Sequence, residues 1–119
     1  MKVCVIGSRS ISSFDLTPYI PNETELLITG GAKGIDTMAE EYADKHGISK
    51  LIVRPNYRLY GHGAPLKRNE IMIDLADVVL AVWDGASRGT AYGLQYAEKR
   101  GKHFLIIPFE KQRNKKEPI

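Results

Sequence analysis

The stretch Ile28-Thr-Gly-Gly-Ala-Lys-Gly-Ile-Asp36 decides how this chain folds, because it joins an apolar run to a helical pattern. Residues 25–29, which lead into it, form a short apolar run of strand length. Beyond it, apolar side chains recur at the spacing of one helix face, at Ile35, Met38, Ala39, Tyr42 and Ala43. A strand-to-helix turn of this kind exposes backbone N–H groups at the positive end of a helix dipole and can bind an anion. The glycines can equally serve only to make a tight turn, so the stretch alone leaves both interpretations open.

Four further apolar runs of strand length occur along the chain, and they do not alternate with polar residues. They span residues 2–6, 50–54, 77–83 and 103–109. Continuous apolar runs are typical of strands buried on both faces, as in a parallel sheet covered by helices. Segments of helical length separate the runs, and this alternation indicates an α/β fold. We therefore predict a doubly wound three-layer sandwich with a five-stranded parallel sheet in the order 3-2-1-4-5.

Prolines and glycines set the expected ends of the first helices. Pro18 and Pro21 interrupt residues 12–20, so we expect only a short helix in that segment. The helix that follows Ile28–Asp36 is expected to end at Gly47, because glycine easily adopts the left-handed conformation just beyond a helix.

The second half of the chain carries similar signals. We expect residues 55–63 to form a polar and aromatic loop, and Pro65 suits the first turn of the helix that follows. The last helix is expected to end at Gly101. It presents small and apolar residues on one face, which would let it lie close to the sheet: Thr90, Gly93, Leu94 and Ala97.

Length and composition indicate one globular domain. The chain has 119 residues, of which 43% are hydrophobic and 26% are charged, as is ordinary for a globular protein. We assign residues 1–109 to the domain and residues 110–119 to a charged, flexible C-terminal tail. The net charge is only +3, and much of the excess lies in the tail. Because the body is nearly charge-balanced, we do not expect nucleic acid to be a partner.

The single cysteine and the scattered histidines argue against disulfide-linked and metal-binding classes of protein. Cys4 cannot form a disulfide within the chain, which fits a reducing cytoplasm, and we expect it to be a small buried hydrophobe. The apolar run around it is too short for a signal peptide or a membrane span, so no membrane partner is expected. No metal site and no cofactor are predicted, since the histidines fall in different elements: His46, His62 and His103. The phosphate-loop motif of nucleoside triphosphatases is absent.

Three loops that carry glycines and hydroxyl groups each follow a predicted strand, at residues 7–10, 30–36 and 84–90. In a parallel sheet they meet at one edge, and ligands bind there at the point where the strand order reverses. In the predicted order the first and third loops face each other, with the second alongside. We predict a site for a nucleotide or a phosphosugar at this edge. Its candidate residues are Gly7, Ser8, Arg9, Gly30, Gly31, Gly34, Asp36, Arg68, Asn69, Asp84, Gly85, Ser87, Gly89 and Thr90.

Most of these residues also have a purely structural interpretation. Arg9 suits a phosphate through two parallel hydrogen bonds, or it forms a surface ion pair. Asp36 binds a sugar hydroxyl, or it lies in the first helical turn because the dipole favours a carboxylate there. Asn69 points inward along an apolar stripe and bonds to loop backbone or to ligand. Ser87 and Thr90 cap the last helix, or they bind phosphate together with a backbone amide.

The segment at residues 55–63 and the helix after it leave two further alternatives open. Tyr57, Tyr60 and His62 either stack on a base or cover the core. The side chain of Arg68 reaches either the same crevice as the loops or solvent.

Taken together, four stretches resemble the SLOG superfamily of Rossmann-like domains, which includes YspA-type SLOG proteins, the LOG phosphoribohydrolases and the DNA-processing protein DprA. These stretches are Val5-Ile-Gly-Ser-Arg9, Thr29-Gly-Gly-Ala-Lys-Gly-Ile-Asp36, Ala64-Pro-Leu-Lys-Arg-Asn69 and Asp84-Gly-Ala-Ser-Arg-Gly-Thr90. They follow the family's order over most of the chain. The resemblance implies a Rossmann-like fold that binds nucleotides or ADP-ribose-like molecules, or that processes nucleotide derivatives.

The chain departs from the enzymes of this family at Gly93. LOG phosphoribohydrolases read Gly-Gly-x-Gly-Thr-x-x-Glu, and Gly93 stands where that glutamate serves N-glycosidic cleavage. Without it, hydrolysis loses its main agent, unless Glu70 or Asp36 substitutes. We therefore expect a sensor or carrier domain for a nucleotide-derived or ADP-ribose-like ligand. The alternatives are an enzyme that hydrolyses or transfers an N-glycosidic or phospho-linked nucleotide derivative, and DprA-like binding of single-stranded DNA. Assembly into a homo-oligomer stays open.

Overall fold

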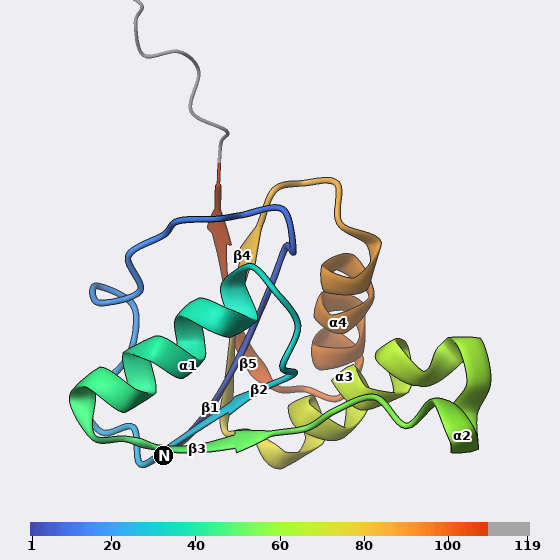
Figure 1. Cartoon of the computed structure of the whole chain (residues 1–119), viewed down its shortest axis with the longest axis horizontal. Helices are drawn as coiled ribbons and strands as arrows, with labels where there is room; N and C mark the ends of the chain where they lie inside the picture. The colour runs from blue at the N-terminus through green and yellow to red at the C-terminus, as the bar shows by residue number, and fades with distance from the viewer. Residues whose placement is uncertain (110–119) are drawn as a thin grey trace, which may run out of the picture.

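The computed structural model describes residues 1–109, so the predicted tail at residues 110–119 lies outside the described residues. Strands and helices alternate along this part of the chain (Figure 1). The elements are β1 (Lys2–Gly7), β2 (Leu26–Thr29), α1 (Ile35–His46), β3 (Ser49–Ile52), α2 (Tyr57–Tyr60), the 3₁₀ turn η1 (Gly61–Gly63), α3 (Ala64–Leu75), β4 (Val78–Trp83), α4 (Arg88–Lys99) and β5 (His103–Pro108).

The five strands form one parallel sheet in the order β3-β2-β1-β4-β5, which confirms the predicted order. Helix α1 covers one face, and α3 and α4 cover the other, so the molecule has the three layers of a Rossmann-like α/β fold (Figure 1). No helix within residues 1–109 is long and apolar enough to cross a membrane.

The central strand β1 supplies both halves of the core. Successive strand residues point to opposite faces, so Val3 and Val5 pack on the side of α1, whereas Cys4 and Ile6 pack under α3 and α4. Burial raises the pKa of the Cys4 thiol far above its ordinary value, which keeps the thiol protonated. Cys4 is therefore the small buried hydrophobe that the sequence indicates.

The prediction of a short helix in residues 12–20 is wrong. This segment contains only turns, and it crosses the α1 side of the sheet as a loop (Figure 1). Pro18 and Pro21 lack the backbone N–H that a helix needs. The loop is held instead by apolar side chains that enter the core beside α1, namely Ile11, Leu16 and Ile20.

Residues 55–63, expected to be a loop, contain the short helix α2 and the turn η1. The Asn56 side chain caps α2 by accepting a hydrogen bond of 3.0 Å from the Leu59 N–H, which is a recognisable helix-start signal. Tyr57 is 60% exposed and Tyr60 is 39% exposed, so these tyrosines do not cover the core.

The other helix boundaries agree with the sequence. Gly47 ends α1 in the left-handed conformation, and Pro65 lies in the first turn of α3. The predicted inner face of α4 is buried: Thr90, Gly93, Leu94 and Ala97. At Gly93 the helix approaches β1 so closely that an added Cβ would lie 2.8 Å from the Cδ1 of Ile6. Gly93 thus faces the core.

Gly34, just before α1, is the glycine at which a side chain should be most destabilising. Its φ is 78°, and an added Cβ would lie 2.6 Å from the Ser8 carbonyl oxygen and 2.8 Å from the Cα of Arg9. These are backbone atoms that cannot rotate away. We expect Gly34→Ala to lower the free energy of unfolding by about 2–4 kcal/mol, measured by urea denaturation.

Gly63→Ala is the matched control for this substitution. Gly63 precedes α3 with a φ of −81°, and an added Cβ there would meet no atom within 4 Å. Gly63→Ala should change the free energy of unfolding by less than about 1 kcal/mol. Equal losses of stability in the two variants would show that Gly34 is not needed for the contact with the loop after β1.

Candidate functional site

A cavity of about 270 Å³ opens at the carboxyl edge of the sheet. Its walls come from the end of β1, the loop before α1, the first turns of α3 and the start of α4. The lining residues are Ile6, Gly7, Arg9, Ala32, Asp36, Pro65, Leu66, Arg68, Asn69, Met72, Ser87, Arg88, Gly89 and Thr90. Ligand pockets commonly span about 300–1,000 Å³, so this cavity suits a small polar ligand or part of a larger one.

The position of the cavity follows from the strand order. β1 and β4 are neighbours in the middle of the sheet, and the chain continues from them in opposite directions across it. The loops that leave these two strands therefore separate, and a crevice remains between them at their carboxyl ends.

The structure brings together residues from all three predicted loops and from α3. Eight of the fourteen candidate residues line the cavity: Gly7, Arg9, Asp36, Arg68, Asn69, Ser87, Gly89 and Thr90. The other six do not line it: Ser8, Gly30, Gly31, Gly34, Asp84 and Gly85. The sequence analysis missed six lining residues, which are Ile6, Ala32, Pro65, Leu66, Arg88 and Met72. Arg88 carried a usable signal, because it is a cation directly after the helix cap Ser87.

Four glycines, at the end of β1 and in the loop before α1, lie close to the cavity. Gly31 and Gly34 have φ values of 75° and 78°, which glycine adopts easily. A Cβ on Gly30 would collide with the guanidinium group of Arg68. A Cβ on Gly7 would lie 2.5 Å from the Ile35 side chain. These glycines permit close packing around the site.

Arg68 connects the strand ends to α3. Its Nη1 donates to the carbonyl of Gly30 at 2.5 Å and to that of Val53 at 3.3 Å, and its Nε donates to Oδ1 of Asn69 at 2.9 Å. Desolvation lowers the pKa of Arg68, and the nearby charge of Asp36 opposes this shift. Arg68 thus lines the cavity, but its Nε and Nη1 already donate hydrogen bonds to oxygen atoms of the protein.

Asn69 uses its amide within the protein as well. Its Oδ1 accepts from Arg68, and its Nδ2 donates to the Gly89 carbonyl at 3.4 Å. Of the two alternatives for this side chain, the structure shows the bond to loop backbone. Asn69 therefore ties α3 to the first turn of α4.

Among residues 1–109, Asp36 is the one acidic side chain that lines the cavity. It is only 7% exposed, and its Oδ2 accepts a hydrogen bond of 3.1 Å from the Ala32 N–H. Burial raises the pKa of the Asp36 carboxyl, although the Ala32 N–H and the charge of Arg68 pull it down. The site therefore contains a carboxyl group that takes up a proton more readily than an exposed aspartate.

Asp84 and Ser8 build the turn behind the cavity. Asp84 Oδ1 accepts from the Ala86 and Ser87 N–H groups, each at 2.9 Å, and these bonds lower the pKa of Asp84 to about 2. The Asp84 N–H donates to the buried Ser8 hydroxyl at 3.1 Å. Asp84 Oδ2 also accepts from the Ser10 hydroxyl at 3.0 Å, so the side chains of Asp84 and Ser8 both hold the loops after β1 and β4 together.

Ser87 caps α4, as the structural interpretation requires. Its Oγ accepts from the Thr90 N–H at 3.4 Å and lies 3.2 Å from the Thr90 hydroxyl. In a helix cap of this kind, the amides of the first two helical residues have no partner within the helix. In α4 these residues are Arg88 and Gly89, and both line the cavity.

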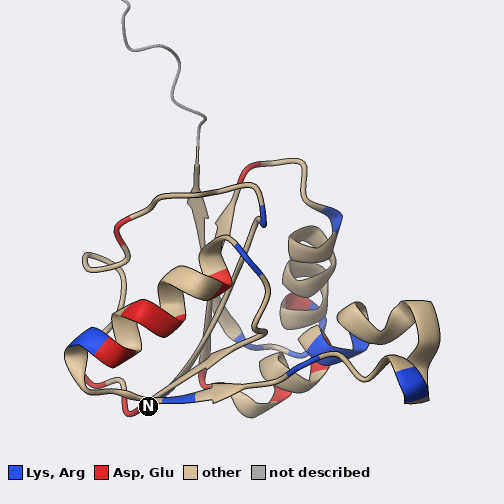
Figure 2. Cartoon of the chain, viewed as in Figure 1, with Lys and Arg blue, Asp and Glu red and all other residues tan. Residues whose placement is uncertain are grey.

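The charge of the cavity wall is positive. In the described part of the chain, Arg9, Arg68 and Arg88 line it, and Asp36 is the single acid. Figure 2 shows blue segments in the loops after β1 and before α1 and at the start of α4. Within residues 1–109 no ion pair joins Arg9 or Arg88 to a carboxylate, so Arg9 is not held in the surface ion pair considered above. This arrangement favours an anion.

Glu70, the other carboxylate considered above as a substitute for the glutamate of the LOG enzymes, lies outside the cavity. It accepts a hydrogen bond from the Tyr92 hydroxyl and pairs with Lys67 at 3.4 Å. The Tyr92 bond is the main reason why the pKa of Glu70 is lowered. Glu70 therefore links α3 to α4 and does not face a ligand in this cavity.

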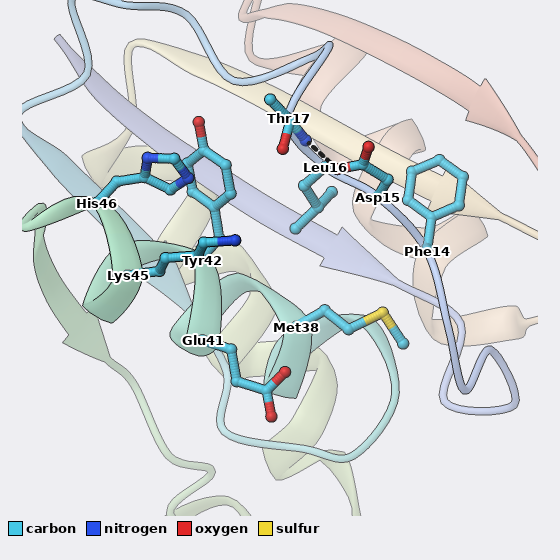
Figure 3. A pocket seen from close by; sticks show the side chains of 9 residues that line it. All are labelled: Phe14, Asp15, Leu16, Thr17, Met38, Glu41, Tyr42, Lys45 and His46. Carbon is cyan, nitrogen blue, oxygen red and sulfur yellow. Dashed lines mark hydrogen bonds between the residues drawn. The ribbon is translucent and has the colours of Figure 1, made fainter.

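A second hollow, of about 220 Å³, lies between α1 and the loop before β2. Figure 3 shows Phe14 and Leu16 of the loop on one side and Met38 and Tyr42 of α1 on the other. Acidic and basic groups both line it, and none of the fourteen candidate residues does. Within residues 1–109 no cluster of three or more potential metal ligands occurs. The cavity at the sheet edge is therefore the candidate site.

The raised pKa of Asp36 predicts a pH-dependent difference in stability. The native state binds a proton more readily than the unfolded chain, whose aspartate titrates near 3.8, so wild-type stability falls as the pH rises through this range. Asp36→Asn removes the titrating group. Its free energy of unfolding relative to wild type should rise between about pH 3.5 and about pH 7, measured by urea denaturation.

Glu41→Gln is the control for this pH dependence. It removes an exposed carboxylate from the same helix and should not reproduce the trend. A stability difference between Asp36→Asn and wild type that is constant with pH would contradict the burial of a charged carboxylate at this position.

Among solved structures, the chain is similar to DNA processing protein A (DprA) from Streptococcus pneumoniae, with a TM-score of 0.74. The match has 23% sequence identity and covers 94% of this chain and 52% of the DprA chain, so this chain spans about half of that protein. No family model and no curated protein matches the sequence. The structural match shows that the chain shares its Rossmann-like fold with part of DprA.

Proposed function

We propose that this domain binds a small nucleotide-derived, ADP-ribose-like ligand at the carboxyl edge of its sheet, as a sensor or carrier. The observation that carries the proposal is the arginine-lined cavity at the point of strand reversal, with the start of α4 in its wall. The resemblance of the four sequence stretches to the SLOG superfamily supports the same ligand class.

The start of α4 suits a phosphate group. The helix has 12 residues, and its dipole places partial positive charge at Arg88 and Gly89. A Cβ on Gly89 would meet no atom within 4 Å, so there is room for a phosphate oxygen to approach the backbone. Arg9 and Arg88 supply charge that no carboxylate of residues 1–109 neutralises by an ion pair.

Asp36 suits a sugar hydroxyl. Its Oδ2 is occupied by the Ala32 N–H, and an aspartate has a second oxygen that can accept from a ribose hydroxyl. Because burial raises the pKa of this carboxyl, its charge is more easily neutralised beside a phosphate. The lining carboxyl and the lining arginines thus fit the two parts of a phosphosugar.

A thermal-shift screen against ADP-ribose, NAD and nucleoside mono- and triphosphates tests the proposal. A ligand at about 100 times its Kd should stabilise the protein by about 2.7 kcal/mol. Arg9→Ala should weaken the binding of the active compound about tenfold or more, since it removes charged hydrogen bonds. Titration calorimetry with this compound measures its affinity for the wild type and for Arg9→Ala.

Arg100→Ala is the matched control for Arg9→Ala. Arg100 follows the other end of α4 and pairs with Asp74 at 3.0 Å, away from the cavity. Arg100→Ala should leave the affinity for the active compound unchanged. A screen in which no compound raises the melting temperature would refute the proposed ligand class.

Catalysis is a second candidate, because Asp36 is a cavity-lining carboxyl with a raised pKa, the property of a general acid. If the domain is an enzyme, Asp36→Asn should abolish release of the base or the phosphate while binding is retained. Product analysis by chromatography over the same panel decides this. Absence of turnover with every bound compound would exclude the enzyme.

Single-stranded DNA is a third candidate, favoured by the fold shared with a DNA processing protein and by the arginines of the cavity. Because the body of the chain is nearly charge-balanced, we expect no tight binding at physiological salt in a filter-binding assay. Micromolar binding that weakens with salt and is lost in Arg9→Ala, but not in Arg100→Ala, would instead make DNA the ligand of this edge.

A further inference from the structure

The strand β5 has an apolar surface that nothing in the described structure covers. It forms one edge of the sheet, beside β4 (Figure 1). Three consecutive side chains of this strand, Phe104, Leu105 and Ile106, are 37%, 47% and 42% exposed. Because strand residues alternate, Phe104 and Ile106 flank one face of the edge, and Leu105 flanks the other. Both sides of the edge are therefore apolar.

The opposite edge of the sheet, β3, is protected. Its Lys50 pairs with Asp44 at 2.9 Å and lies 4.0 Å from Glu40. A charged lysine on an edge strand discourages pairing with another chain. In contrast, residues 104–107 of β5 carry no charge. The two edges thus differ in the feature that normally prevents association.

The backbone of β5 is also ready to pair. The N–H of Phe109 donates to the Trp83 carbonyl at 3.0 Å, so this residue and alternate residues before it direct their N–H groups toward β4. Phe104 and Ile106 lie between them and direct their N–H and C=O groups away from the sheet. Within residues 1–109 no strand pairs with this side of β5.

We propose that β5 pairs antiparallel with β5 of a second copy of this chain, about a two-fold axis at Leu105, to form a continuous sheet through both subunits. In this register Phe104 of each copy lies opposite Ile106 of the other. Each of these two pairs exchanges both of its hydrogen bonds, and the two Leu105 side chains meet on the axis. The interface is isologous, as in most homodimers.

The neighbouring two-fold registers are less complementary. An axis at Ile106 would place Phe104 opposite Pro108, which has no N–H to donate. An axis at Phe104 would place Ile106 opposite Lys102, whose N–H is already bonded to the Ala97 carbonyl at 2.9 Å. With the axis at Leu105, the outward donors of Phe104 and Ile106 both meet outward acceptors, and the mismatched pair of Lys102 and Pro108 falls at the end of the ladder.

The composition of residues 110–119 favours a second copy of β5 over this segment as the partner of the edge. Residues 110–119 contain only Pro118 and Ile119 as apolar residues, and the others are charged or amide side chains. Such a segment cannot cover Phe104, Leu105 and Ile106. A second β5 offers the same apolar residues in matching positions and brings no like charges together.

The first experiment measures the oligomeric state by sedimentation velocity at tens of micromolar protein. The wild-type chain should sediment as a dimer, and Leu105→Lys should sediment as a monomer. Leu51→Lys is the matched control, because Leu51 is 39% exposed on the protected edge strand, and it should remain dimeric. Circular dichroism establishes that both variants are folded.

The second experiment traps the register. Across the proposed axis the two Leu105 residues form a non-hydrogen-bonded pair with a Cα–Cα distance of about 4.5 Å, within the range for a disulfide. Leu105→Cys should therefore give a covalent dimer on mild oxidation, whereas Leu51→Cys should not. The native Cys4 is fully buried and does not compete.

Three outcomes would overturn the proposal. They are a monomeric wild-type chain at these concentrations, a dimer that survives Leu105→Lys, and a Leu105→Cys variant that does not crosslink. Another protein that binds wild type but not Leu105→Lys, while the wild type alone is monomeric, would assign the edge to that partner instead. None of these results depends on the ligand of the cavity.

Discussion

The close contact between Gly34 and the backbone of Ser8 and Arg9 determines the shape of the cavity at the carboxyl edge of the sheet. It is possible only because position 34 carries no side chain and has a positive φ. Gly7 makes the reciprocal contact with Ile35 at the start of α1. These two contacts hold the first and second loops together, so that the crevice lies between them and the start of α4. The other features of the site depend on this spacing.

Some polar side chains of the cavity form hydrogen bonds within the described part of the chain, whereas others have few partners there. Arg68 and Asn69 bond to the carbonyls of Gly30, Val53 and Gly89, and so connect three elements around the cavity. Their polar atoms are largely satisfied by the protein. Arg9, Arg88, Asp36 and the first amides of α4 are the groups to which we assign ligand contacts in the proposed function. Within residues 1–109 the cavity thus combines a hydrogen-bonded frame with a few charged side chains.

Gly93 has the packing role that the small residues on its helix face indicate. It faces Ile6 in the core, and a larger side chain would have to displace that isoleucine. The resemblance to LOG phosphoribohydrolases indicates a missing glutamate at this position. The structure adds that α4 lies against β1 where the glutamate would stand. Recovering the family's acid would therefore require repacking of α4 as well as one substitution.

The sequence by itself determined the strands, their order and the edge at which polar loops meet, because these follow from local apolar patterns and from the rules of parallel sheets. Only the tertiary structure decided which residues line the cavity, since Ser8 and Asp84 turn to each other while Arg88 and Leu66 turn inward. In residues 12–20 the core contacts of Leu16 and Ile20 hold a loop where we expected a short helix, and in residues 55–63 the local cap at Asn56 starts a helix where we expected a loop. The reason is physical: a strand is specified by its own apolar residues, whereas a loop or a cavity wall is specified by distant partners.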